Sequence, residues 1–195
     1  MPAATASGSL EAVLAALARA LDDSGAPWMV IRGVAVIAHG VRRLTTDVDA
    51  VVRGDAIRID ALVDVLARHD IEPRIENAIE FAQQNLVLLM RHRTTGVDLD
   101  VSLAWSSFEL EALAAATLMP FGSVHVRMPT PSDLVVFKAI AGRPKDVEDA
   151  ETLLVLHGDI DLARTRARVA DLTALTDAPE LLAAFDQLAA RARRA

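Results

Sequence analysis

The amino-acid sequence predicts an α+β protein, with a mixed β-sheet flanked by helices over residues 1–130 and a helical bundle over residues 131–195 packed on it. Three observations carry this prediction. Segments of helical periodicity alternate with short apolar strands as far as Met128. The sequence Thr94–Gly96, between two of these strands, is typical of a hairpin turn. From Pro131 onward, every segment has the spacing of a helix.

The individual elements follow from periodicity and from turn residues. The first helix has apolar residues three and four positions apart from Leu10 to Leu21, and it ends at the turn Ser24–Pro27. Two of the strands, Asp47–Val52 and Val97–Leu103, alternate Asp with Val or Leu. The expected helices are 9–23, 34–39, 56–69, 107–116, 131–141, 145–157, 160–174 and 178–193, and the expected strands are 28–31, 47–52, 86–90, 97–103 and 124–128.

The composition excludes several classes of protein. The chain has 195 residues, 52% of them hydrophobic and 24% charged, which is typical of a folded domain rather than a disordered one. Cysteine is absent, so disulfides, thiolate metal sites and cysteine nucleophiles are excluded. The net charge of −7 argues against a protein that coats nucleic acid through a broad positive surface. With no apolar run long enough to span a bilayer, we expect a cytoplasmic protein without membrane contact.

Two acidic strands are the most informative feature of the sequence. Residues i and i+2 of a strand point the same way, so Asp47 and Asp49 present two carboxylates from one face. Asp98 and Asp100 repeat this arrangement on a second strand, and either of them could complete a cluster of three. Repelling carboxylates are neutralised most easily by a cation, and oxygen ligands suit Mg²⁺. Three carboxylates can hold two metal ions roughly 4 Å apart, which favours displacement at phosphorus.

A glycine precedes the first acidic pair. Gly33 lies between a strand and a short helix, where backbone N–H groups can approach phosphate oxygens. Alone, an Asp-x-Asp sequence is more often a solvated strand face than a metal site, and a lone glycine is weaker still. The combination of strand, glycine, helix, acidic pair and second acidic strand favours the functional interpretation.

This combination resembles the nucleotidyltransferase fold of the DNA polymerase β superfamily. In that superfamily a Gly followed by Gly or Ser precedes Asp-x-Asp by about nine to thirteen residues, so the resemblance places Gly33 at the second position and Asp47 and Asp49 in the pair. The sequence from Arg43 to Asp49, RLTTDVD, is similar to the AbiEii/MenT-like branch of minimal bacterial nucleotidyltransferases, many of them toxins of toxin–antitoxin pairs. One departure is Arg32, which stands where the family usually has the first Gly.

A downstream segment, residues 131–154, is similar to the same branch. The branch has a helix with Lys, followed by Arg and then Asp, and Lys138, Arg143 and Asp146 fill those places, with Asp149 close by. The resemblance implies that Lys138 contacts the triphosphate of a nucleotide and assists catalysis. Other interpretations remain open for these residues: Lys138 as a partly buried helix lysine, Arg143 and Lys145 as loop residues, and Asp146 as a cap at the start of the next helix.

The resemblance implies a Mg²⁺-dependent transfer of a nucleoside monophosphate from a nucleoside triphosphate to an acceptor hydroxyl, with release of pyrophosphate. Asp47, Asp49 and Asp100 are the implied metal ligands, and Asp98 is the alternative to Asp100. Further nucleotide-binding residues are expected among Arg32, Gly33, Arg43, Thr45, Lys138, Arg143 and Asp146. The branch implies a tRNA acceptor and a cognate antitoxin protein. Alternatives are a small antibiotic-like acceptor, a protein acceptor, or an inactive nucleotide-binding module in which Arg32 is the lesion.

Overall fold

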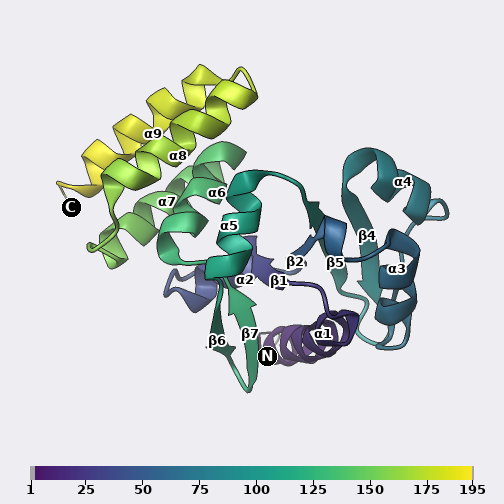
Figure 1. Cartoon of the computed structure of the whole chain (residues 1–195). Coiled ribbons are helices and arrows are strands. Elements are labelled where there is room, and N and C mark those ends of the chain that lie inside the picture. Colours follow the sequence, from purple (N-terminus) through teal and green to yellow (C-terminus); the bar gives the residue numbers. More distant parts are fainter. Residues whose placement is uncertain (1–2, 195) are drawn as a thin grey trace. The chain divides into compact units, whose positions relative to one another are not determined.

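The computed structural model describes residues 3–194, and the chain divides into two compact units (Figure 1). The first unit comprises the chain up to Val34 together with Leu44–Met128. The second comprises Ala35–Arg43 and the chain from Pro129 onward. The sequence analysis expected residues 35–43 in the first domain, whereas their contacts group them with the C-terminal helices. The terminal residues 1, 2 and 195 of the expected domains lie outside the described part of the chain.

The first unit contains a five-stranded sheet, a two-stranded sheet and four longer helices. Its helices are α1 (Ala3–Ser24), α3 (Ile59–Ala67), α4 (Ala78–Asn85) and α5 (Ser107–Ala115), with a single 3₁₀ turn at Gly54–Ala56. Its strands are β1 (Trp28–Ile31), β2 (Val48–Arg53), β3 (Ile71–Pro73), β4 (Val87–His92), β5 (Asp98–Ala104), β6 (Thr117–Phe121) and β7 (Val124–Met128). Helix α2 (Arg32–Ala38) follows β1 directly and its residues are shared between the two units.

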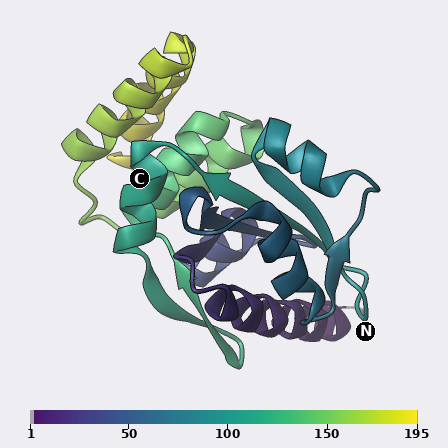
Figure 2. The ribbon, with the colours of Figure 1, turned by 45° about the vertical axis from the view of Figure 1, so that its right-hand side comes forward.

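The five-stranded sheet has the order β1-β2-β5-β4-β3 and is mixed, as the sequence predicts. Strands β2 and β5 run parallel in its centre, and all other neighbours are antiparallel. The hairpin expected at Thr94–Gly96 joins β4 to β5. Helix α1 lies beside α3, which lies beside α4 (Figure 2). Leucines at helical spacing on α1, including Leu14, Leu17 and Leu21, are fully buried and form part of the core.

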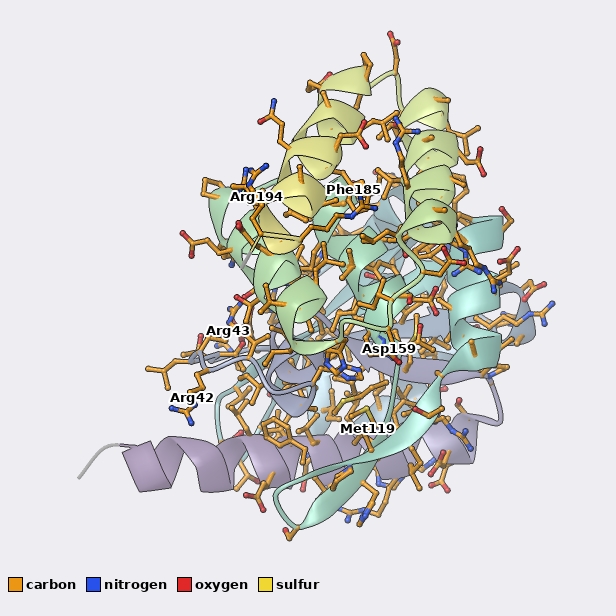
Figure 3. All side chains as sticks on the ribbon, turned by 90° about the vertical axis from the view of Figure 1, so that its left-hand side faces the viewer. Arg42, Arg43, Met119, Asp159, Phe185 and Arg194 are labelled. Carbon is orange, nitrogen blue, oxygen red and sulfur yellow. The ribbon has the colours of Figure 1, made fainter. Side chains whose placement is uncertain are left out.

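The second unit is helical, as predicted from the spacing of its apolar residues. Its helices are α6 (Pro131–Ala141), α7 (Pro144–Leu156), α8 (Leu162–Leu175) and α9 (Pro179–Ala192). Helix α6 packs on α7 and α8, and α9 packs on α7 and α8. Phe185 of α9, labelled in Figure 3, is buried in this unit. Across residues 3–194, no helix is both long and apolar enough to cross a membrane.

Three elements have no counterpart among the sequence predictions. Strand β3 has three residues, of which only Ile71 is buried, so it is too short to show an alternating pattern. Asn77, the N-cap of helix α4, makes no side-chain capping hydrogen bond, and the only buried residues of the helix are its two alanines, Ala78 and Ala82. Strand β6 contains Pro120 and has no fully buried residue. Each of these elements lacks the hydrophobic pattern on which the prediction depends.

Replacement of Leu99 by Ala tests how far the central strands support the fold. Leu99 is fully buried between Asp98 and Asp100 on β5, so Leu99→Ala should lower the free energy of unfolding by about 2–5 kcal/mol. Leu118 on β6 is 61% exposed, and Leu118→Ala is the matched control, expected to change stability by less than about 0.5 kcal/mol. Urea unfolding followed by circular dichroism measures both. Equal losses in the two variants would contradict the prediction.

Candidate active site

The parallel pairing of β2 and β5 brings the candidate carboxylates together. Asp49 and Asp100 are direct partners in the register of these strands, and Asp47 comes immediately before β2. Asp49 is buried, Asp100 is partly buried and Asp47 is exposed. Burial raises the pKa of Asp49 from 3.8 to about 6, with Arg32 opposing this shift and the charges of Asp47 and Asp100 adding to it. Asp47, Asp49 and Asp100 thus lie near one another in the first unit, and their role as metal ligands stays a prediction.

Asp98 has a different environment from Asp100, although the two share a strand face. Its carboxylate accepts a hydrogen bond of 2.7 Å from Arg91 Nε, and this bond lowers the pKa of Asp98. Asp98 pairs in the sheet with Arg91, whereas Asp100 pairs with Asp49. The register therefore favours Asp100 over Asp98 as the third member of the cluster.

Arg32 occupies the position where the resembling family has its first Gly. Its backbone has φ = 56°, in the left-handed region that glycine adopts without strain. Its side chain donates a hydrogen bond of 2.7 Å from Nη1 to Asp49 Oδ1. The backbone conformation gives a physical reason for the family's Gly, and the ion pair shows what the side chain does in this protein.

Gly33 and Thr45 meet beside the acidic pair. A Cβ at Gly33 would lie 2.4 Å from Thr45 Oγ1 and 2.9 Å from Thr45 Cβ, so Thr45 occupies the space that a side chain would need. The Thr45 hydroxyl donates a hydrogen bond of 2.9 Å to Asp47 Oδ1. Gly33 therefore permits the approach of Thr45, and Thr45 orients the first carboxylate of the pair.

A polar cavity of about 450 Å³ lies beside the cluster, entirely within the first unit. It is lined by Thr46, Asp47, Arg74, Thr95, Gly96, Val97, Asp98 and Asp100. Arg74, which follows β3, donates a hydrogen bond of 2.8 Å from Nη2 to Asp100 Oδ1, and its Nη1 lies 3.7 Å from Asp98 Oδ2. Sequence reasoning did not find Arg74, because it lies in a segment without a recognisable pattern.

The donor set of the cluster fits a hard divalent cation. Carboxylate oxygens are the ligands that Mg²⁺ prefers, and Asp49 and Asp100 project from directly paired positions of neighbouring strands. In the described part of the chain, no three His, Cys, Asp or Glu side chains are already arranged around a common metal position. Two of the three carboxylates instead make ion pairs with Arg32 and Arg74. Binding a metal ion here therefore requires these side chains to rearrange.

In the second unit, Lys138 is the centre of a buried charge network. Its side chain is 3% exposed, and its Nζ lies 2.9 Å from Asp146 Oδ1 and 2.8 Å from Asp149 Oδ2. Sequence analysis expected Lys138 to contact a triphosphate. The structure places its ammonium group between two carboxylates of α7, so the charged end is buried and not at the surface as in a partly buried helix lysine. The contact with a triphosphate stays a prediction.

Two arginines complete this network. Arg143 Nε lies 2.5 Å from Asp146 Oδ2, and Arg43 Nη1 lies 2.6 Å from Asp149 Oδ2. Burial raises the pKa of Asp146, but the hydrogen bonds from Arg143 and Lys138 outweigh it and hold that pKa below its ordinary value. Asp146 lies in the first turn of α7, where a negative charge is also favoured by the helix dipole. Figure 3 shows Arg42 beside Arg43, with the Arg42 side chain exposed.

The predicted site residues thus form two groups. Arg32, Gly33, Thr45, Asp47, Asp49 and Asp100 lie in the first unit, and Arg43, Lys138, Arg143 and Asp146 lie in the second. Asp149, which the sequence placed close to Asp146, connects Arg43 to Lys138. Each group is held together by its own hydrogen bonds.

The family profile described as "nucleotidyltransferase of unknown function (DUF6036)" matches residues 9–190. The chain belongs to this family. It is therefore a nucleotidyltransferase, and the enzyme class predicted from its motifs is confirmed. No curated protein matches the chain.

Solved structures confirm the predicted nucleotidyltransferase fold. The chain is similar to the antibiotic-resistance factor ANT(2'')-Ia in solution, with 17% identity, a TM-score of 0.60, and coverage of 91% of this chain and 96% of that one. It is similar to an antigenic nucleotidyltransferase-like protein from Paracoccidioides brasiliensis, with 20% identity, a TM-score of 0.56, and coverage of 93% and 94%. A crystal structure of ANT(2'')-Ia with adenylyl-2''-tobramycin has 19% identity, a TM-score of 0.51, and coverage of 98% and 99%. The finer AbiEii/MenT-like assignment stays a prediction.

Removal of the Lys138 charge should destabilise the second unit. In Lys138→Met, Asp146 and Asp149 lose a shared buried cation, and we expect the free energy of unfolding to fall by about 3–5 kcal/mol. Lys145→Met is the matched control at an exposed position, where we expect a change within about 0.5 kcal/mol. Urea denaturation at neutral pH measures both losses. The buried network would be refuted as a stabilising feature if the two variants were equally stable.

The raised pKa of Asp49 predicts how the stability of the protein depends on pH. Since the folded-state pKa of about 6 exceeds the ordinary 3.8, the folded state binds more protons between these values, and stability falls as pH rises through them. In metal-free buffer, Asp49→Asn should be more stable than the parent protein by about 2–3 kcal/mol above about pH 7, and equally stable near about pH 4. The groups facing Asp49 are Arg32, Asp47 and Asp100, and none is altered. Thermal unfolding of both proteins across this pH range measures the difference. A difference in stability between Asp49→Asn and the parent protein that does not change with pH would contradict the prediction.

Proposed function

We propose that this nucleotidyltransferase transfers a nucleoside monophosphate from a nucleoside triphosphate to the hydroxyl of an acceptor, with Mg²⁺ held by Asp47, Asp49 and Asp100. The observation that carries the proposal is the register of β2 and β5, which sets Asp49 opposite Asp100 with Asp47 immediately before β2. The buried setting of Asp49 is energetically unfavourable for a carboxylate without a bound cation, which is typical of functional rather than structural acids.

The reaction needs few chemical groups from the protein. The acceptor oxygen attacks the α-phosphorus, the bond from the α-phosphorus to the bridging oxygen of pyrophosphate breaks, and pyrophosphate leaves with the electron pair. Asp100, partly buried beside the cavity, accepts the proton of the acceptor hydroxyl. Bound Mg²⁺ would supply stabilisation of the charge that develops on the phosphate oxygens. Thr45 keeps Asp47 oriented, and Gly33 leaves the space that Thr45 occupies.

Lys138 is the centre of the buried charge network of the second unit, which it forms with Asp146, Asp149, Arg43 and Arg143. Because Lys138 is buried, we assign it to positioning: it holds the two carboxylates that in turn hold Arg43 and Arg143.

A small hydroxyl-bearing molecule is the acceptor that the geometry favours. The cavity of about 450 Å³ beside Asp47 and Asp100 has the dimensions of a small-molecule pocket. The similar ANT(2'')-Ia is an antibiotic-resistance factor whose structure contains adenylyl-2''-tobramycin, which supports an acceptor of this class. The net charge of −7 disfavours a large RNA-binding surface. A tRNA acceptor with a cognate antitoxin, which the AbiEii/MenT resemblance implies, remains the alternative.

Label transfer tests the proposed reaction. The protein is incubated with Mg²⁺ and each α-³²P-labelled nucleoside triphosphate, in separate reactions with aminoglycosides, total tRNA or a protein mixture. We expect label on the small molecules, and its complete loss with EDTA. Asp49→Asn and Asp100→Asn should lower the rate by at least about 100-fold, because each removes a ligand or the base.

Asp55→Asn is the matched control, since Asp55 follows strand β2 but is exposed and pairs with Arg53 outside the cavity. We expect its rate to stay within a few-fold of the parent protein. Label found on tRNA alone would contradict the small-molecule acceptor and support tRNA as the acceptor. Pyrophosphate release that survives in Asp49→Asn, or nucleotide binding without transfer to any acceptor, would refute the proposed reaction.

A further inference from the structure

Two guanidinium groups hold the carboxylates on which the proposed reaction depends. Arg32 Nη1 lies 2.7 Å from Asp49 Oδ1, and Arg74 Nη2 lies 2.8 Å from Asp100 Oδ1. Both distances are those of charge-assisted hydrogen bonds. Asp49 and Asp100, which pair across β2 and β5, are therefore each neutralised by an arginine from elsewhere in the first unit.

The two arginines come from segments that follow the two edge strands of the five-stranded sheet, β1 and β3. Arg32 follows β1, which borders β2, whereas Arg74 follows β3 at the other edge of the sheet. The backbone N–H of Arg74 donates to the carbonyl of Leu89 on β4, which fixes the start of a side chain that extends to Asp100 on β5. Two separate elements thus deliver positive charge to the same pair of carboxylates.

We propose that Arg32 and Arg74 are displaceable counterions, each occupying a carboxylate until a divalent cation takes its place. This inference rests on the proposed function, because it concerns the same carboxylates. Asp47, Asp49 and Asp100 have a formal charge of −3, and the two guanidiniums reduce it to −1. A divalent cation is attracted less strongly to the paired cluster than to the free one, so the arginines set the metal affinity of the site.

The exposure of the side chains indicates which groups move. Arg32 has 46% of its side chain exposed, whereas its partner Asp49 has 8%. Arg32 can therefore leave toward solvent while Asp49 stays in place. Arg74 has 22% of its side chain exposed and also lies 3.7 Å from Asp98, so Asp98 can receive Arg74 when Asp100 turns to a metal ion. Asp98 then acts as the resting partner of Arg74.

The left-handed backbone of Arg32 supports a functional reason for the arginine. Glycine would adopt φ = 56° without strain, so retention of a long cationic residue there costs stability. In the proposal, the hydrogen bond between the Arg32 guanidinium and Asp49 offsets this loss of stability. Residue 32, where the resembling family has a glycine, therefore carries a side chain that binds the carboxylate of Asp49 in this protein.

Metal titration without nucleotide tests the exchange. Mn²⁺ binding to the full chain is measured by electron paramagnetic resonance and by isothermal titration calorimetry for the parent protein, Arg32→Gln and Arg74→Gln. Each variant removes one competing positive charge, and we expect its Mn²⁺ dissociation constant to fall about fivefold or more. Arg53→Gln is the matched control: it removes an exposed arginine that pairs with Asp55, which takes no part in the proposed exchange, and its dissociation constant should stay within about twofold of the parent value.

Two further measurements test the exchange even if the glutamine variants fold poorly. Arg32→Gly removes both the charge and the strained side chain, so it should gain the same Mn²⁺ affinity as Arg32→Gln and melt at a higher temperature than Arg32→Gln, which also lacks the ion pair but keeps a side chain at φ = 56°. In the parent protein, Mg²⁺ should shift the ¹⁵N side-chain resonances of Arg32 and Arg74 and leave that of Arg53, a remote exposed arginine, unchanged. Equal Mn²⁺ affinities in all variants, an equal gain in Arg53→Gln, or Arg32 and Arg74 resonances insensitive to Mg²⁺ would overturn the inference.

These outcomes are distinguishable from failure of the proposed function. If label transfer requires Asp49 and Mg²⁺ but the arginine variants bind Mn²⁺ as the parent does, the reaction stands and the exchange is wrong. If the arginine variants gain affinity but no acceptor receives label, the exchange stands and the transferase reaction is wrong.

Discussion

The pairing of Asp49 with Asp100 across the parallel strands β2 and β5 is the constraint on which the candidate site depends. Parallel register sets the two residues about 4.8 Å apart at the backbone, so their carboxylates share a small volume. Val51, two residues after Asp49 and therefore on the same face of β2, is a buried apolar residue, so this face is part of the core. Burial of a carboxylate there is unfavourable unless it is paired with a cation. Arg32 and Arg74 supply positive charge to Asp49 and Asp100, Thr45 orients Asp47, and Gly33 leaves space for Thr45.

Much of the fold could be predicted from the sequence because most of its elements bury a regular pattern. The strand Trp28–Ile31 and the helix Pro131–Ala141 have the bounds that their periodicity predicts. The acidic cluster could be predicted because strand parity fixes direction, and the choice of Asp100 needed only the register with Asp49. Arg74 could not be predicted, since it reaches Asp100 through a long side chain from a short edge segment, and no local pattern encodes such a contact. The grouping of residues 35–43 with the C-terminal helices depends on contacts distant in sequence, including the hydrogen bond between His39 and the Pro129 carbonyl.

Lys138 could be singled out from the sequence because it fills a place in the resembling motif, whereas its buried contacts with Asp146 and Asp149 could not be predicted. The structure indicates why arginine would not replace it. An ammonium group is compact and has three donors, so it fits between the carboxylates of Asp146 and Asp149 in a space from which solvent is excluded. A planar guanidinium needs more room. Arg143 binds the other oxygen of Asp146, whereas Arg43 shares Oδ2 of Asp149 with Lys138. The geometry of this buried pair of acids therefore favours lysine at position 138.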